Sequence, residues 1–88
     1  MIKVIRFTAP WCAPCRMLAP VFKQLEQELS DVTFETVNID ETPDVATTYS
    51  VRSIPTVIVF KNDMDVISLT GAGSKRQYMD MIQEARDA

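Results

Sequence analysis

Two cysteines, Cys12 and Cys15, are the residues of this 88-residue chain best suited to chemistry. Ala13 and Pro14 lie between them, and the chain contains no histidine. The lack of histidine excludes Ser-His-Asp triads, Cys-His proteases and imidazole metal sites. A cysteine pair with this spacing can hold a metal, form a structural disulfide or exchange thiols with disulfides.

Ligand count and loop length argue against the first two uses. Structural zinc takes four nitrogen or sulfur ligands, so a site made of thiolates alone would need a dimer. Covalent haem attachment needs a histidine after the second cysteine, where this chain has Arg16. A disulfide across so short a loop contributes roughly 2 kcal/mol, against about 3 kcal/mol for a fifteen-residue loop. We therefore expect no metal, and we favour catalytic thiol–disulfide exchange.

Thiol–disulfide exchange places two demands on the local structure. The first thiol must be exposed and have a lowered pKa, and the second must lie within reach of it. Both demands are met if Cys12 lies at a helix N-terminus, where free backbone N–H groups and the helix dipole stabilise a thiolate. Cys15, one turn later, would then lie beneath Cys12 and be less exposed.

The pattern of apolar residues predicts the elements that position the cysteines. Residues 2–7 are β-branched and aromatic and predict a strand, and apolar residues spaced three and four apart predict a helix from Cys12. The pattern further predicts strands at 32–39, 56–60 and 65–70, a short helix capped by Thr42 that runs to about Tyr49, and a last helix that begins with a capping box of Ser74 and Gln77. The order is β-α-β-α-β-β-α, and we expect a single domain over residues 1–88.

Charge and hydropathy limit the classes of partner. The net charge of −3 argues against a nucleic-acid backbone, which needs a basic face. No apolar run approaches the roughly 20 residues that span a bilayer. The N-terminus lacks the apolar region and cleavage site of a signal peptide. We therefore expect a cytoplasmic monomer that binds neither nucleic acid nor membranes.

In its cysteine motif and its order of predicted elements, the chain resembles the thioredoxin family. Residues 11–15, Trp-Cys-Ala-Pro-Cys, are similar to the family's active site Trp-Cys-Gly-Pro-Cys, with alanine in place of glycine. Residues 53–56, Ser-Ile-Pro-Thr, are similar to the family's loop before the central strand, where a proline takes the cis form. Residues 37–40 and 60–62 and Gly71 also fall in the family's register, so the resemblance covers nearly the whole chain.

The resemblance implies an α/β thioredoxin fold in a minimal form. Its four-stranded mixed sheet would be flanked by helices, with the strands in the spatial order second, first, third, fourth. The family's additional N-terminal strand and helix have no counterpart, which makes the second strand an edge that Glu35 helps to protect.

The resemblance also implies a function, that of a protein disulfide reductase. Cys12 would attack a disulfide of a substrate protein, and Cys15 would resolve the mixed disulfide. The redox-active pair itself would serve in place of any cofactor. The implied partners are protein disulfides and an electron donor of the thioredoxin reductase type.

The resemblance implies that the residues between the cysteines, Ala13 and Pro14, tune the redox potential, and we expect Arg6 to tune it as well. Pro14 stiffens the turn and removes a hydrogen-bond donor near the sulfur. Arg6 falls where the family has a buried aspartate, six residues before the first cysteine. A cation there would stabilise a thiolate and make the disulfide more oxidising. Alternatively, Arg6 reaches the surface or pairs with Glu35 or Asp40 and leaves the thiols alone.

Five residues are predicted to form a substrate-binding surface around the cysteines. Trp11 would offer an apolar surface beside the first thiol. Pro55, if cis, would face the cysteines and expose the backbone of Ile54 to an extended substrate segment. Gly71 and Ala72 would form the third side of this surface.

Three other functions stay open. A glutaredoxin matches the chain in length, although glutaredoxins typically carry Cys-Pro-Tyr-Cys. A thioredoxin-fold docking subunit would use the same surface without redox turnover. An oxidant or isomerase would fit the cation at Arg6.

Overall fold

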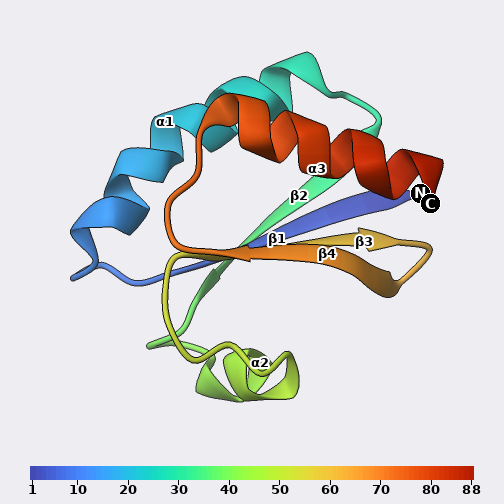
Figure 1. The fold of residues 1–88 in the computed structure, drawn as a ribbon. Helices are drawn as coiled ribbons and strands as arrows, with labels where there is room; N and C mark the ends of the chain where they lie inside the picture. Colours follow the sequence, from blue (N-terminus) through green and yellow to red (C-terminus); the bar gives the residue numbers. More distant parts are fainter.

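The strand that precedes the cysteines lies inside a four-stranded sheet with helices on both faces (Figure 1). The computed structural model describes residues 1–88. The elements in chain order are β1 (Ile2–Thr8), α1 (Ala13–Glu28), β2 (Val32–Asn38), α2 (Pro43–Thr48), β3 (Thr56–Lys61), β4 (Met64–Thr70) and α3 (Lys75–Asp87). Their order confirms the predicted fold, and each strand boundary lies within one residue of its prediction.

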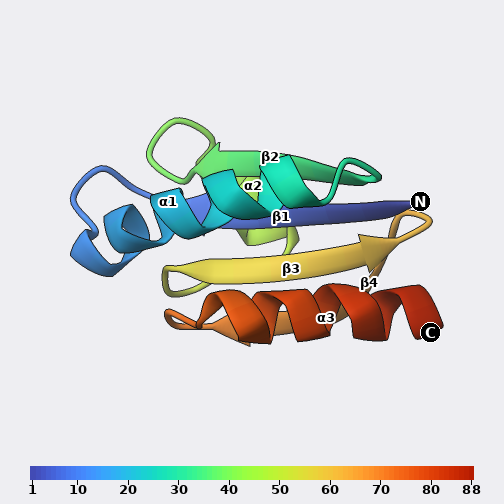
Figure 2. The same ribbon diagram turned by 90° about the horizontal axis from the view of Figure 1, so that it is seen from above.

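The sheet is mixed, and its strand order is β2-β1-β3-β4. Strand β1 pairs parallel with β2 and antiparallel with β3, which in turn pairs antiparallel with β4. Phe7 is opposite Thr56, and Thr56 is opposite Thr70. The end of β1, the start of β3 and the end of β4 therefore lie side by side, and Figure 2 shows the connected loops at one end of the sheet.

Helices α1 and α3 cover one face of the sheet and α2 covers the other (Figure 1). Side chains alternate between the faces of a strand. In β1, Val4 packs in the cluster of twelve buried residues under α1 and α3, whereas Ile5 and Phe7 pack in a cluster of six on the α2 side. Because the larger cluster includes Leu18, Phe22 and Leu25 of α1, this packing holds the helix that carries the cysteines.

The helix starts differ in how they satisfy their free N–H groups. In α3 the predicted capping box is confirmed, since Ser74 Oγ accepts from the Gln77 N–H and the Gln77 side chain accepts from the Ser74 N–H. Thr42 is the N-cap residue of α2, but the predicted side-chain cap is absent. Its hydroxyl donates to the Asn38 carbonyl oxygen at 3.3 Å, which draws it back toward the end of β2.

Both outer strands of the sheet carry polar and charged side chains. At the β2 edge, Glu35 Oε2 lies 3.6 Å from Nζ of Lys3 on the neighbouring strand β1, and the two exposed side chains form an ion pair. Charged side chains of this kind discourage pairing with another strand.

None of the three helices has the length and apolar character that crossing a bilayer requires.

Candidate active site

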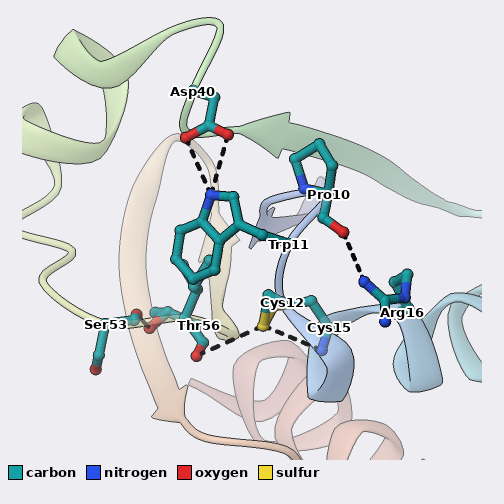
Figure 3. The surroundings of a disulfide bond; sticks show 9 residues. Pro10, Trp11, Cys12, Cys15, Arg16, Asp40, Ser53 and Thr56 are labelled. Carbon is teal, nitrogen blue, oxygen red and sulfur yellow. Dashed lines mark hydrogen bonds between the residues drawn. A yellow bond between two sulfur atoms is a disulfide. The ribbon is translucent and has the colours of Figure 1, made fainter.

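Cys12 and Cys15 form a disulfide at the start of α1. Their Cα atoms lie 5.2 Å apart, and Cys12 is the N-cap residue, with an extended backbone that ends the loop after β1. The Sγ atom of Cys12 accepts a hydrogen bond from the Cys15 N–H at 3.3 Å (Figure 3). The predicted position of Cys12 at a helix N-terminus is confirmed. The sulfur thus occupies the place of a capping oxygen.

The two sulfur-bearing residues differ in access to solvent. Cys12 is 5% exposed, whereas Cys15 is completely buried, so Cys15 lies beneath Cys12 as predicted. The prediction of an openly exposed first cysteine is wrong for this disulfide form. Cys12 packs in a small cluster with Ala9, and half-buried Ile39 and Ile54 lie against it. A partner can reach only a small part of Cys12, from the surface that these neighbours leave open.

The residues between the cysteines shape the first turn of α1. Ala13 and Pro14 are both exposed, and Pro14 lies within the first two helical positions. Because a proline has no N–H, it can occupy this turn without loss of a helical hydrogen bond. Cys15 therefore supplies the N–H that bonds to Cys12.

Trp11 lies beside the disulfide and is two-thirds exposed, at 66%. Its indole Nε1 donates to both carboxylate oxygens of Asp40, at 3.1 and 3.4 Å (Figure 3). Asp40 follows β2, which runs parallel to β1, so the two residues meet beyond the same ends of neighbouring strands. No local pattern in the sequence links Asp40 to Trp11. The parallel order of these strands is the signal that could have indicated it.

One more side chain fixes the loop before the disulfide. Arg16 Nη1 donates to the Pro10 carbonyl oxygen at 2.6 Å (Figure 3). This bond ties the first turn of α1 to the loop that carries Trp11.

No group of three or more His, Cys, Asp and Glu side chains converges on a point where it could hold a metal ion.

The loop before β3 approaches the disulfide from the other side. The Ile54–Pro55 peptide bond is cis, as the resemblance predicts, and Pro55 is buried. The carbonyl oxygen of Ile54 lies 4.0 Å from Cys12 Sγ. The Gly71 N–H donates to the Pro55 carbonyl oxygen at 2.8 Å, and Ala72 beyond it is exposed. The structure therefore places Ile54 against Cys12 and ties Gly71 to the same loop through Pro55, whereas Ala72 has no contact with the disulfide.

Arg6 is half-buried on the face of β1 that α1 covers. Its guanidinium carbon lies 5.3 Å from the centre of the Phe22 ring, and Nη2 donates to Thr36 Oγ1 at 3.4 Å. The suggested pairing with Glu35 or Asp40 is wrong, because neither carboxylate reaches it. Side-chain alternation places Glu35 on the opposite face, and Asp40 accepts from Trp11 instead.

Burial decides the electrostatics of Arg6. Desolvation lowers the pKa of its guanidinium, and the nearby charge of Glu26 and the Tyr78 phenol partly offset this effect. No ion pair within 4 Å includes Arg6, and its buried Nε has no hydrogen-bond partner. Because arginine is effectively always protonated in proteins, Arg6 remains charged at neutral pH. Its positive charge is therefore not cancelled by a contacting carboxylate.

Tyr78 gives a prediction for stability at high pH. Burial raises the pKa of its phenol above the ordinary value of 10.0, while the Gly73 N–H and the Arg6 charge lower it in part. The unfolded chain then ionises at lower pH than the folded one. The contribution of Tyr78 to stability is complete below about pH 10 and is lost as pH rises through the folded pKa.

Urea unfolding from pH 8 to 11 would measure this loss. We expect the free energy of unfolding to fall more steeply above pH 10 in the wild type than in Tyr78→Phe, which has no ionisable phenol. Tyr49→Phe, which alters a partly exposed tyrosine, should keep the wild-type slope. Equal slopes for the wild type and Tyr78→Phe would contradict this assignment.

Comparison with known proteins assigns the chain to a family. The family model described as Thioredoxin matches residues 1–84. The chain is 48% identical over 73 residues to "Thioredoxin 1" of Synechococcus elongatus, covering 82% of this chain and 68% of that protein. It is 43% identical over 82 residues to "Thioredoxin M-type, chloroplastic" of Zea mays, covering 92% of this chain but 49% of that protein, about half of its length.

A solved structure agrees with these matches. The X-ray structure of Fasciola hepatica thioredoxin superimposes with a TM-score of 0.90 at 32% identity, covering 96% of this chain and 80% of that one. The family match favours a thioredoxin over a glutaredoxin, and the redox pair it requires is present as a disulfide. The chain therefore belongs to the thioredoxin family, and its Cys12–Cys15 pair makes it a thiol–disulfide oxidoreductase.

Proposed function

We propose that this oxidoreductase acts as a reductase of disulfide bonds in other proteins, with Cys12 as the attacking residue. One observation carries the proposal: Cys12 Sγ lies at the N-terminus of α1, where it accepts a hydrogen bond from the Cys15 N–H, and Cys12 is more accessible to solvent than Cys15. In the reduced protein the same N–H and the helix N-terminus stabilise a thiolate at Cys12. Burial of Cys15 keeps it away from substrate but next to Cys12.

The reaction proceeds in two exchanges of sulfur. The Cys12 thiolate attacks one sulfur of the substrate disulfide, forms a mixed disulfide and displaces the other substrate sulfur as a thiolate. Cys15 then loses its proton and attacks Cys12 Sγ. The Cys12–Cys15 disulfide forms, and the second substrate sulfur leaves. Two electrons pass to the substrate, which gains two thiols after protonation.

The substrate segment is proposed to bind across the loops that surround Cys12. Trp11 supplies an exposed apolar surface, fixed by its bonds to Asp40. The Ile54 backbone, next to Cys12 Sγ, offers polar groups that an extended segment can bond. Gly71 and Ala72 border the same site through the bond from Gly71 to Pro55.

The proposed partners follow from this cycle. Protein disulfides are the oxidised substrates, and a reductase of the thioredoxin reductase type returns the Cys12–Cys15 disulfide to the dithiol. The proteins named thioredoxin among the relatives support a dithiol cycle, and the absence of histidine leaves the cysteine pair as its reactive group.

The reduction potential of the Cys12–Cys15 pair tests the proposed direction. Equilibration in dithiol and disulfide buffers, followed by alkylation of free thiols, should give a value near about −270 mV. The reduced protein should also reduce insulin. A potential near about −180 mV or above would contradict a reductase and favour an oxidant or isomerase. If the two cysteines form no reversible disulfide, only the role of a docking subunit without redox turnover would remain. Turnover with glutathione as the sole electron donor would instead indicate a glutaredoxin-like cycle.

Arg6 is proposed to shift this potential toward less negative values. Its charge is half-buried, is cancelled by no ion pair and faces α1, the helix that carries both cysteines. The variant Arg6→Met should therefore have a more negative potential than the wild type, by about 15 mV or more, a roughly threefold change in equilibrium constant. Lys3→Met, on the opposite face of β1, is the matched control. An unchanged potential in Arg6→Met would contradict the role.

A further inference from the structure

The hydroxyl of Tyr78 connects the core under α3 to the loop that precedes this helix. Tyr78 is 1% exposed, and its ring centre lies 4.8 Å from that of Phe22. Its oxygen accepts a hydrogen bond from the Gly73 N–H at 2.8 Å. A buried aromatic ring thus ends in a polar atom that bonds to the backbone of a loop.

Gly73 is fitted closely against this phenol. A Cβ atom added at Gly73 would lie 3.1 Å from Tyr78 Cζ and 2.7 Å from Leu69 Cδ2, closer than normal contact. The loop backbone therefore rests directly on the tyrosine and leucine side chains. Only one residue, Ser74, separates Gly73 from α3, and the capping box of Ser74 fixes that end of the loop.

The other end of the loop borders the disulfide. Gly71, two residues before Gly73, donates its N–H to the Pro55 carbonyl oxygen at 2.8 Å. The carbonyl oxygen of the preceding residue, Ile54, lies 4.0 Å from Cys12 Sγ. Figure 1 shows the loop, in orange, rising from β4 to the start of α3. Displacement of Gly73 would therefore move a wall of the proposed substrate site without touching either cysteine.

We propose that Tyr78 is a positioning residue for protein substrates: its hydroxyl holds Gly73 and thereby keeps Gly71 and Ala72 in place beside Pro55. This role rests on the proposed function, because it concerns the surface that a protein disulfide contacts. The hydroxyl acts through the loop and has no contact with the sulfur atoms. It should therefore affect binding of a large substrate and leave the exchange chemistry unchanged.

The test compares Tyr78→Phe with the wild type on two disulfides of different size. With dithiothreitol as donor, we expect KM for insulin to rise roughly three- to tenfold, the effect of one lost hydrogen bond, with kcat within about twofold. The rate with the small disulfide 5,5′-dithiobis(2-nitrobenzoate) should not change. The Gly73 amide should also exchange its hydrogen faster. Tyr49→Phe is the matched control, since the Tyr49 hydroxyl has no hydrogen-bond partner in the protein and its ring packs on the other face of the sheet against Phe7 and Phe60.

A second variant guards against a folding defect in the first. Gly73→Ala adds a Cβ only 3.1 Å from Cζ of the buried Tyr78 ring, so it should push the loop away from this ring and raise KM for insulin in the same way. Faster exchange at Gly73 with an unchanged KM would overturn the role of Tyr78, as would an equal rise in KM in Tyr49→Phe. A wild-type chain that reduces the small disulfide but not insulin would overturn the proposed function and this role together.

Discussion

Replacing Cys15 by serine should stop turnover and capture the substrate as a stable mixed disulfide. Cys12 keeps its sulfur and its place at the start of α1, so its attack on a substrate disulfide should still proceed. The attack that releases Cys12 is lost because a serine hydroxyl does not displace a thiolate from a disulfide. Insulin reduction should fall by about three orders of magnitude or more. Non-reducing electrophoresis and mass spectrometry would detect the adduct.

The matched variants separate the roles of the two cysteines. Cys12→Ser should lose turnover to the same extent but form no adduct, because buried Cys15 cannot reach a protein disulfide. Met17→Ala, on the exposed surface of α1, should keep near-wild-type turnover, since Met17 is 76% exposed. An adduct formed by Cys12→Ser instead of Cys15→Ser would reverse the assignment. Turnover retained without Cys12 would remove this pair from the reaction.

The elements that hold the cysteines could be predicted because their signals are local. The apolar run from Thr56 to Phe60 predicts a strand covered on both faces, and all five of these residues are buried. Ser74 and Gln77 predict the start of α3 because a capping box lies within one turn. The Thr42 cap was predicted on the same local reasoning and failed. A hydroxyl can bond backward as well as forward, and here it bonds to Asn38.

The parts of the site that escaped prediction depend on contacts between distant residues. The bond from Trp11 to Asp40 joins residues from two loops that only the parallel pairing of β1 and β2 brings together. The environment of Arg6 depends on which face of β1 it occupies. Its contact with Phe22 follows from the way α1 packs on the sheet, and a local sequence pattern cannot predict that packing.

The low solvent exposure of Cys12 could not be predicted from the sequence either. A helix N-terminus predicts the direction of the sulfur, but its cover comes from Ile39 after β2 and Ile54 before β3. The position of Cys12 at a helix N-terminus could therefore be predicted from the sequence, whereas its burial could not. Residues distant in the sequence therefore decide how much of Cys12 is exposed to solvent.

Replacing Phe7 by alanine should produce the largest loss of stability among single core substitutions on the α2 side of the sheet. Phe7 is completely buried, and its ring centre lies 6.1 Å from that of Tyr49. It packs in one cluster with Val37, Ala46 and Ile58, which belong to three different elements. The change removes this apolar contact and leaves a cavity, at a cost of about 3–5 kcal/mol in the free energy of unfolding. Urea unfolding followed by circular dichroism would measure it.

Two further variants show whether the loss comes from packing. Phe7→Leu keeps most of the volume and should cost less than about 1.5 kcal/mol, if the core repacks. Met64→Ala removes a side chain that is 73% exposed and should change stability by less than about 0.5 kcal/mol. Because β1 pairs with a strand on each side and leads into the Cys12 loop, Phe7→Ala should also lower insulin reduction at temperatures where the protein begins to unfold. A loss below about 1 kcal/mol in Phe7→Ala would contradict the role of this ring in holding α2 to the sheet.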